Sequence, residues 1–246
     1  MKKGLQLVFC LAFPVLFSFS PAPSFKARPA ESYKKILVSA KTTAKVSLKE
    51  RLFAFYNTSL RRAGLSRDAF KYAVTGYMNL LSMGRLNNSR YLTIVDFSQS
   101  SLKKRFYLLD IRAAKLVINT YVAHGRNSGS IMANNFSNRP ESAESSLGFY
   151  ITKHTYYGDH GYALRIGGVE KGFNTNAEER AIVVHGSHYV NSAMARAGFM
   201  GRSLGCPALP CAVSTQVIQK IKNGSALFIY HPTKSYLQHS RLLAKA

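Results

Sequence analysis

Cysteine is scarce in this sequence of 246 residues, which contains only three. Cys10 lies in an apolar N-terminal segment, so Cys206 and Cys211 are the two thiols expected in the mature chain. A single close pair does not form the disulfide framework that stabilises small secreted domains. A disulfide between Cys206 and Cys211 remains open on spacing alone, but we expect at least one of these thiols to be kept for chemistry.

Carboxylates are also few, with 11 Asp and Glu against 34 Lys and Arg and a net charge of +23. A charge of this size attracts polyanions over a long range. The positive residues are scattered, and there is no basic helix, zinc finger or aromatic RNA-binding motif, so we expect no nucleic acid partner. We expect anionic cell-envelope polymers instead. The alternative is that the charge only solvates the surface.

Long apolar runs are missing except at the N-terminus. A short basic start is followed by an apolar run over Leu5–Phe19 of about 15 residues, and then by small residues and prolines up to Ser24. This order is typical of a secretory signal peptide, and the run is shorter than the roughly 20 residues that span a bilayer. We predict a signal peptide over residues 1–24 and an exported protein, periplasmic or wall-associated, with no stable membrane span after cleavage. Cleavage would remove two lysines and leave a charge of +21.

Helical spacing follows a linker-like stretch over residues 25–45. Ser47 and Glu50 form a capping-box pattern, and apolar side chains then recur at helical spacing until Gly64. Ser66 can cap a second helix, which ends near Gly84. We therefore predict a helical N-terminal extension over residues 46–86.

From about Tyr91 the apolar spacing changes to a period of two, which indicates strands. We predict a mainly β, antiparallel domain over residues 90–232, one late helix over residues 212–222, and a loose basic tail over residues 233–246. The candidate strands are Tyr91–Phe97, Arg105–Ile111, Leu116–Ala123, Leu147–Thr152, Tyr162–Ile166, Ala181–His185 and Ala226–Tyr230.

The densest chemical information lies between Ala181 and Cys211. A buried strand ends in His185-Gly186, and about twenty residues later comes the stretch Arg202-Ser203-Leu204-Gly205-Cys206-Pro207. Glycine before the cysteine allows a tight turn, and proline after it fixes the backbone. Such a turn can present the sulfur and aim the backbone N–H groups of Gly205 and Cys206 at a developing oxyanion.

A thiol that attacks an amide carbonyl needs a base, and His185 is the obvious partner of Cys206. The second ring nitrogen of the imidazole needs an orienting group. A backbone carbonyl near Gly186 could supply it, or a carboxylate that approaches in space. The candidate carboxylates are Glu170, Glu178 and Glu179.

The sequence pattern leaves several other interpretations of these residues open. His185 could be a buried core histidine, and Cys206 could be a buried structural cysteine. Zinc could bind His185, His188, Cys206 and Cys211, although their spacing is untypical. Serine catalysis is not supported because the G-x-S-x-G elbow is missing, and the glycines at 167–168 lack the end of a phosphate loop.

These residues resemble the L,D-transpeptidase catalytic domain of the YkuD-like family, whose mark is H-G, a gap, and then S-x-G-C. Gly148–Ile151 is similar to the G-x-F-x-I strand of that family. The stretches His124–Gly129 and Arg202–Ala208 resemble the murein L,D-transpeptidases in particular. The resemblance covers roughly Tyr91 to Pro232.

The resemblance implies an L,D-transpeptidase-type β-sheet domain around a catalytic cleft, with no cofactor and no metal. Cys206 would be the nucleophile and His185 the general base and acid. The carbonyl of Gly186 would hold the imidazole, and Gly205 with Cys206 would form the oxyanion hole, supported by Ser203. The weaker candidates for substrate binding are Arg202, His124 and Arg126.

The implied reaction is acyl transfer between peptidoglycan stem peptides, which serve as donor and acceptor. Cys206 would displace D-alanine from a tetrapeptide stem, and an amine of a second stem would resolve the thioester as a 3-3 crosslink. An L,D-carboxypeptidase or crosslink-cleaving peptidase could use the same site. A papain-like peptidase usually places Cys before His, contrary to the order here. A non-catalytic wall-binding protein is a further alternative. The chain departs from many relatives at Leu204, where they have histidine, and at Pro207-Ala208.

Overall fold

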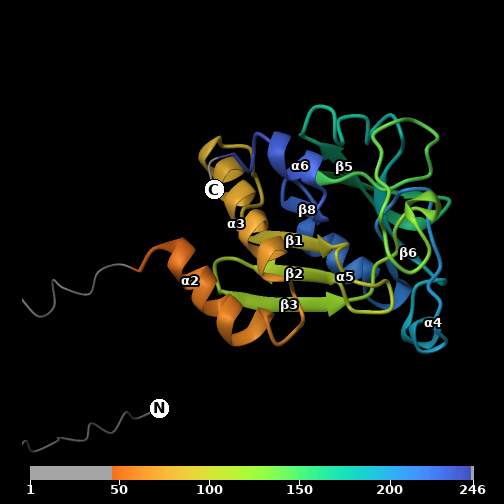
Figure 1. Ribbon diagram of the computed structural model, residues 1–246, viewed down its shortest axis with the longest axis horizontal. Coiled ribbons are helices and arrows are strands. Elements are labelled where there is room, and N and C mark those ends of the chain that lie inside the picture. The colour runs from red at the N-terminus through yellow and green to blue at the C-terminus, as the bar shows by residue number, and fades with distance from the viewer. Residues whose placement is uncertain (1–45, 245–246) are drawn as a thin grey trace, which may run out of the picture. The chain divides into compact units, whose positions relative to one another are not determined.

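The computed structural model describes residues 46–244, so the predicted signal peptide and linker lie outside the described residues. This part of the chain is mainly β, with one eight-stranded sheet in the order β3-β2-β1-β8-β4-β5-β6-β7 (Figure 1). The strands are β1 (Tyr91–Asp96), β2 (Phe106–Asp110), β3 (Lys115–Thr120), β4 (Gly148–Gly158), β5 (Gly161–Gly168), β6 (Val183–Ser187), β7 (Ala208–Pro210) and β8 (Ala226–Tyr230).

The sheet is mixed, so the expected antiparallel arrangement holds for five of its seven strand pairs and is wrong for two. β1 pairs in parallel with β8, and β6 pairs in parallel with β7, while the other neighbours are antiparallel. A parallel pair needs a long connection rather than a hairpin. The segment between β6 and β7, which contains α4 (Ser192–Arg196), supplies one for that pair. β1 and β8 are the first and last strands of the sheet in sequence order, so a long stretch of chain connects them.

The N-terminal helices begin where their caps predict. The Ser47 hydroxyl accepts a hydrogen bond from the Glu50 N–H, and the Glu50 carboxylate accepts one from the Ser47 N–H. α2 (Leu48–Phe55) continues as a π-helical segment over Tyr56–Leu60. α3 (Arg67–Ser82) then packs against β1 and β8, so its apolar face belongs to the core of the sheet.

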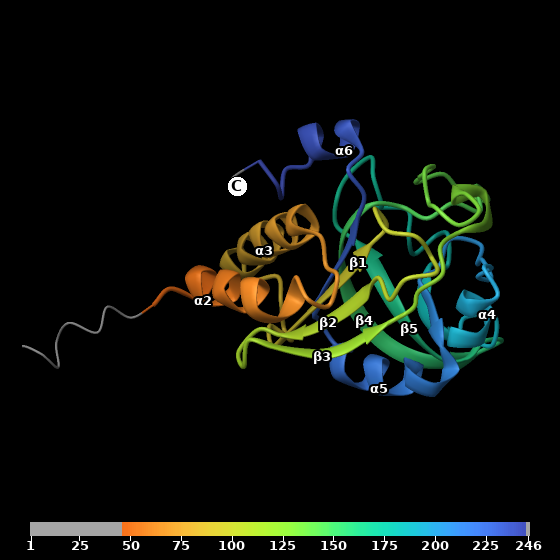
Figure 2. The same cartoon turned by 60° about the horizontal axis from the view of Figure 1, so that its bottom comes forward.

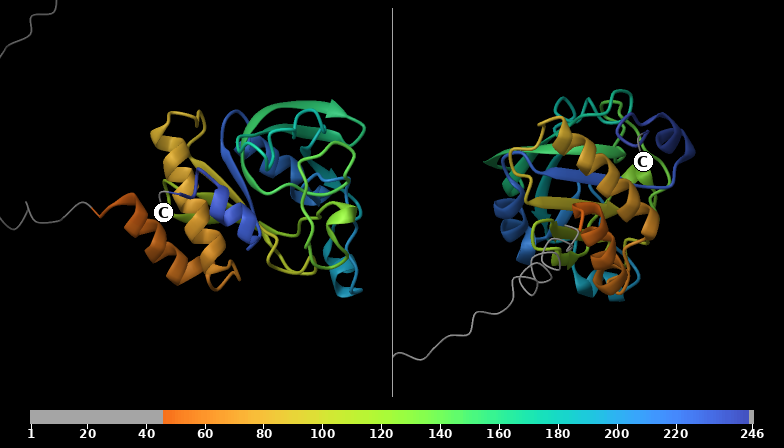
Figure 3. Two further views of the ribbon diagram at one scale, coloured as in Figure 1. Left: turned by 45° about the horizontal axis from the view of Figure 1, so that its top comes forward. Right: turned by 90° about the vertical axis from the view of Figure 1, so that its left-hand side faces the viewer.

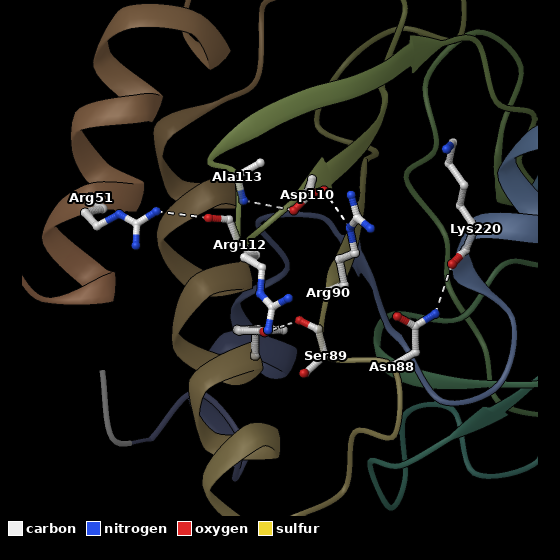
Figure 4. Close-up of polar contacts among 9 residues, drawn as sticks. Arg51, Asn88, Ser89, Arg90, Asp110, Arg112, Ala113 and Lys220 are labelled. Atoms are coloured by element: carbon white, nitrogen blue, oxygen red, sulfur yellow. Dashed lines mark hydrogen bonds and ion pairs between the residues drawn. The ribbon is translucent and has the colours of Figure 1, made fainter. Parts of the chain in front are cut away.

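Polar contacts join α2 to the turn between β2 and β3 (Figure 4). Arg51 donates to the carbonyl of Arg112 at 3.0 Å. Asp110 accepts from the Ala113 N–H at 2.9 Å and forms an ion pair with Arg90 at 2.7 Å. The buried Asp110 carboxylate therefore stabilises the β2–β3 turn, and the backbone of this turn accepts the hydrogen bond from Arg51 of α2.

The predicted late helix is present as α5 (Cys211–Ile221). It contacts β1 and also β5, β6 and β7, so the sheet curls around it (Figure 2). Its buried face is formed by Ser214, Val217, Ile218 and Ile221. Within residues 46–244, no helix has both the length and the apolar character needed to cross a bilayer.

The segment after Pro232 is not a loose tail, contrary to expectation. It forms α6 (Lys234–His239), in which Tyr236 is fully buried and donates to the Glu170 carboxylate at 2.8 Å. Ser240 donates to the same carboxylate. The following residues lie beside α3, where Asn79 donates to the carbonyl of Leu242 (Figure 3). A buried carboxylate needs such donors, and they hold the C-terminal segment in place.

Glu170→Ala should lower the free energy of unfolding by about 2–4 kcal/mol, because it leaves the buried Phe149 N–H and the Tyr236 hydroxyl without their acceptor. The matched control is Glu178→Ala, which removes an exposed ion pair with Lys153 and should cost about 1 kcal/mol or less. Urea denaturation measures both losses. Equal losses would contradict the account of the C-terminal segment.

Candidate active site

His185 lies in the middle of β6, opposite Ala163 of β5 on one side and Ala208 of β7 on the other. Its side chain is buried, and its Nδ1–H donates to the carbonyl of Gly186 at 3.0 Å. A carbonyl can only accept, so this bond leaves Nε2 unprotonated. Burial lowers the pKa of His185, an effect that the Gly186 carbonyl opposes and His160 reinforces. The imidazole is therefore a neutral base.

Gly186 also lets α5 approach β6 closely. A Cβ at this position would lie 2.5 Å from the Ser214 hydroxyl and 3.4 Å from the Cys211 Cα. No carboxylate orients His185 among the described residues. Glu170 is engaged by the C-terminal segment, and Glu178 pairs with Lys153. The orienting group is thus the backbone carbonyl, one of the two options open from the sequence.

The Cys206 thiol is half-buried beside the same strand. Its Sγ accepts from the Val183 N–H at 3.4 Å and lies 3.8 Å from the Ala181 carbonyl oxygen. The parallel register of β6 and β7 places Cys206 beside Val183, and His185 is one strand repeat further, about 7 Å along β6. Within residues 46–244, no hydrogen bond joins the thiol to the imidazole. The resting thiol is directed instead at the backbone of Ala181 and Val183.

Burial raises the pKa of Cys206, and the Val183 N–H and the Arg180 guanidinium partly oppose that rise. The thiol and the imidazole are therefore both neutral at rest. A preformed thiolate–imidazolium pair would require the opposite shifts, with the pKa of the thiol lowered and that of the imidazole raised.

The turn that carries Cys206 is held by Ser203. Its hydroxyl accepts from the Gly205 N–H at 3.0 Å and donates to the Cys206 carbonyl at 2.7 Å. Gly205 has a φ of +128°, and a Cβ there would lie 2.8 Å from the Glu144 carbonyl oxygen, so both conformation and space require glycine. The Gly205 N–H is already engaged, whereas the Cys206 N–H donates to no group within residues 46–244. Only the second of the two expected oxyanion donors is open.

The stretch that begins at His124 runs beside this turn. The Ser203 N–H donates to the His124 carbonyl at 2.9 Å, and the Arg126 N–H donates to the Ser203 carbonyl at 2.8 Å. The His124 side chain is fully buried between Arg105, at 2.7 Å, and the Gly129 carbonyl, at 3.2 Å. Burial, followed by Arg105, lowers its pKa to about 4. The ring is enclosed by the protein, which does not favour the expected contact of His124 with substrate, and its contacts position the backbone beside Ser203.

Arg126 and Arg202 are both exposed at the same edge. Arg202 donates through Nη1 to the carbonyls of Arg126, at 3.3 Å, and Gly129, at 3.1 Å. The rest of its guanidinium stays open to solvent. Leu204, which stands where many relatives have histidine, is 64% exposed. The cysteine turn and the stretch beside it therefore present two cations to solvent, Arg202 and Arg126, and the turn has no imidazole at position 204.

Arg180 was not predicted from the sequence. Its guanidinium donates to the carbonyls of Ser137, at 2.6 Å, and Glu144, at 2.5 Å, and to the Ser142 hydroxyl at 3.1 Å. It also lies 3.2 Å from the position that a Cβ of Gly205 would take. Arg180 thus connects the 137–146 loop to the cysteine turn. One arginine in the run E-E-R before a strand gives no sequence signal for this role.

His160 was also missed, because G-D-H-G indicates only a turn. It lies in the loop between β4 and β5, and its ring stacks on that of His185 with centroids 4.3 Å apart and planes 18° from parallel. Sequence patterns cannot detect this contact because it depends on how the hairpin folds over β6.

Alternative chemistry finds no support in the described residues. No three His, Cys, Asp or Glu side chains between positions 46 and 244 lie close enough to share a metal ion. Cys206 and Cys211 are both free thiols, so the disulfide left open by their spacing is not formed. A cavity of about 690 Å³ lies apart from His185 and Cys206, lined by parts of α3 and by residues 169–173 and 239–242.

Comparison with known proteins gives one family. The model of the L,D-transpeptidase catalytic domain matches residues 61–230, which is more than half of the chain. No protein of curated function matches the sequence.

Among solved structures, the chain is similar to an L,D-transpeptidase from Mycobacterium smegmatis, with 11% identity and a TM-score of 0.36 over 58% of this chain and 59% of that one. It is also similar to L,D-transpeptidase 1 from Mycobacterium tuberculosis, with 10% identity and a TM-score of 0.32 over 58% and 62%. The helical cell shape determining protein Pgp2 from Campylobacter jejuni is 13% identical, with a TM-score of 0.37 over 64% and 56%. The match therefore covers less than two thirds of each of these proteins.

The two thiols should differ in reactivity toward an alkylating reagent at mildly alkaline pH. Burial raises the pKa of Cys206 and limits access to it, whereas Cys211 is exposed at the start of α5. We expect alkylation of Cys206 to be about ten-fold slower or more, because the thiolate is the reactive form. Peptide mapping by mass spectrometry follows each site separately. Faster labelling of Cys206 would show an activated thiolate at rest.

Proposed function

This chain belongs to the family of L,D-transpeptidase catalytic domains, and we propose that it is an exported cysteine acyltransferase that crosslinks peptidoglycan stem peptides. One observation carries the proposal. A buried imidazole, oriented through Nδ1 by the Gly186 carbonyl, lies on the strand that pairs with the segment bearing the Cys206 turn. This arrangement provides a nucleophile and a base on adjacent backbone segments.

Acylation begins with the thiol neutral. Cys206 turns about its Cα–Cβ bond away from Val183 and Ala181 and transfers its proton to Nε2 of His185. The sulfur then forms a bond to the carbonyl carbon of the donor stem, and the carbonyl electron pair moves to oxygen. The imidazolium returns the proton to the nitrogen of D-alanine as the C–N bond breaks. A thioester on Cys206 remains.

The second step reverses these roles. The side-chain amine of an acceptor stem attacks the thioester, and His185 takes a proton from that amine. The C–S bond breaks, and the proton returns to the Cys206 sulfur, which restores the neutral pair. The oxyanion of each tetrahedral intermediate is stabilised by the Cys206 N–H, and one such donor is worth about 3–4 kcal/mol. Gly205 could contribute only after its N–H leaves the Ser203 hydroxyl.

Arg202 and Arg126 are the cations available for substrate carboxylates. Both are exposed; the Arg126 N–H donates to the Ser203 carbonyl, and Arg202 directly precedes Ser203, which is three residues before the nucleophile. Stem peptides carry carboxylates near the reacting bond, and arginine suits them because of its planar set of donors. We assign these two residues to substrate binding, and we assign no substrate contact to His124.

The segment between β6 and β7 bears on the choice between transfer and hydrolysis. Val190 and Met200 are buried in a small cluster with Ala123 and Ala208, and α4 lies between them in sequence. Phe199 is 49% exposed. α4 itself has no buried residue, so we propose that the two buried ends hold this segment beside the thioester, where it limits the access of water. This supports transfer over the carboxypeptidase alternative, which would use the same Cys206 and His185.

Incubation with tetrapeptide substrate should yield crosslinked dimers in excess of hydrolysed tripeptide, as measured by mass spectrometry of the products. Cys206→Ala should abolish both products, and His185→Gln should lower both by on the order of 10³-fold, because no other base replaces the imidazole. Cys211→Ser is the matched control and should keep most activity. Tripeptide as the only product would assign a carboxypeptidase, and an active Cys206→Ala variant would exclude the mechanism.

We propose anionic wall polymers as a second partner on the basis of charge. Without residues 1–24 the chain carries +21, which attracts such polymers. Binding to isolated wall sacculi should weaken with added salt, because the screening length falls to about 8 Å at physiological ionic strength. A sedimentation assay across salt concentrations measures this. Binding that does not change with salt would mean that the charge is incidental.

A further inference from the structure

His160 comes from a part of the chain far from both catalytic motifs. Gly158 and Gly161 pair at the end of the β4–β5 hairpin, so Asp159 and His160 form a two-residue loop. From this loop the His160 ring lies on the His185 ring, with centroids 4.3 Å apart and planes 18° from parallel. A separation this small leaves no room for a water layer between the rings.

We propose that His160 is a positioning residue of the active site, which covers one face of the catalytic imidazole and holds the ring with Nε2 available to Cys206. This inference rests on the proposed function. His160 itself is exposed, whereas His185 is buried, so the outer ring separates the inner one from solvent. The hairpin loop thereby becomes part of the active-site wall.

The geometry explains why a cover is needed. The Nδ1 bond to the Gly186 carbonyl is the only hydrogen bond that holds the His185 ring within residues 46–244. One bond fixes one edge of a ring but still permits tilting about it. A second ring stacked on the face restricts that tilt, and a small error in the direction of a base is costly in rate.

The titratable groups around His185 support the same role for His160. His160 faces it from the β4–β5 loop, where Asp159 is the neighbouring charged group. The Cys206 thiol lies in the turn before β7, and α5 places the Ser214 hydroxyl and the Cys211 backbone beside Gly186. A proton on His160 would repel one on His185, which favours the neutral base.

The Tyr189 phenol and the Arg180 guanidinium complete this environment on the Cys206 side. Neither residue contacts the His185 ring through a hydrogen bond among the described residues. Among residues 46–244, His160 is the group whose ring stacks on that of His185. The ring contact and the ionisable nitrogens of His160 can be separated experimentally, because phenylalanine keeps the flat ring and removes the nitrogens.

Three variants test the proposal: His160→Ala, His160→Phe and, as a control, His154→Ala, which removes an exposed histidine from β4 of the same hairpin. His160→Ala should lower kcat about ten-fold with little change in KM, and His160→Phe should restore kcat to within about three-fold, because the ring and not the nitrogen holds the base in place. His154→Ala should match the wild type. Equal losses in His160→Ala and His160→Phe, or no loss in either, would overturn the proposal.

The pH dependence gives a readout that a purely structural role would not change. Removal of the cover raises the pKa of His185 toward its ordinary value, so His185 is protonated at a higher pH and the acid limb of kcat/KM moves up. We expect this shift to be about half a unit or more in His160→Ala and smaller in His160→Phe. An acid limb that does not move in His160→Ala would contradict the proposal.

NMR titration of the His185 imidazole separates this inference from the proposed function, because it needs no turnover. If the wild-type protein crosslinks and hydrolyses nothing, the proposed function fails. A rise of the His185 pKa in His160→Ala would still support the cover, and an unchanged His185 titration would reject it. Thermal melting of the three variants identifies any loss that comes from unfolding of the hairpin.

Discussion

The parallel pairing of β6 with β7 is the constraint on which the site depends. It places Ala208 opposite His185 and leaves Cys206, two residues earlier, beside Val183 of the same strand. Side chains on one face of a strand recur at about 7 Å. The proposed nucleophile and base therefore lie one strand repeat apart although they are about twenty residues apart in sequence. Most other features of the site support this pairing, including the Ser203 turn and the close contact of α5.

Burial then decides the protonation of the pair. It lowers the pKa of His185 and raises that of Cys206, so both groups are neutral before substrate arrives. In this state the thiol is hydrogen-bonded to the Val183 N–H of β6 and not to the imidazole. In the mechanism that we propose, catalysis consequently starts with a rotation of the thiol and a proton transfer. A neutral thiol at rest also resists oxidation better than a thiolate, because the thiolate is the reactive form.

The sequence predicted the features that depend on local spacing. Alternation of apolar residues located seven of the eight strands, and the Ser47 and Ser66 caps located the two N-terminal helices. The strand β7 was missed because Ala208–Pro210 is short and lies between prolines. Parallel pairing, the docking of α6 on Glu170, and the contacts of Arg180 and His160 depend on distant segments, which local periodicity does not encode. The burial of His124 also depends on distant residues, because its ring contacts Arg105, which lies 19 residues earlier in the sequence.

The central claim is that Cys206 forms a covalent thioester with a donor stem while His185 takes its proton. Intact-protein mass spectrometry after brief exposure to a tetrapeptide stem, without acceptor, tests it most directly. The account predicts an added mass equal to the stem minus D-alanine, located by peptide mapping on the segment that contains Cys206. It also predicts that this adduct is absent in Cys206→Ala and forms far more slowly in His185→Gln. An adduct on Cys211, or product formation without any adduct on Cys206, would contradict the account.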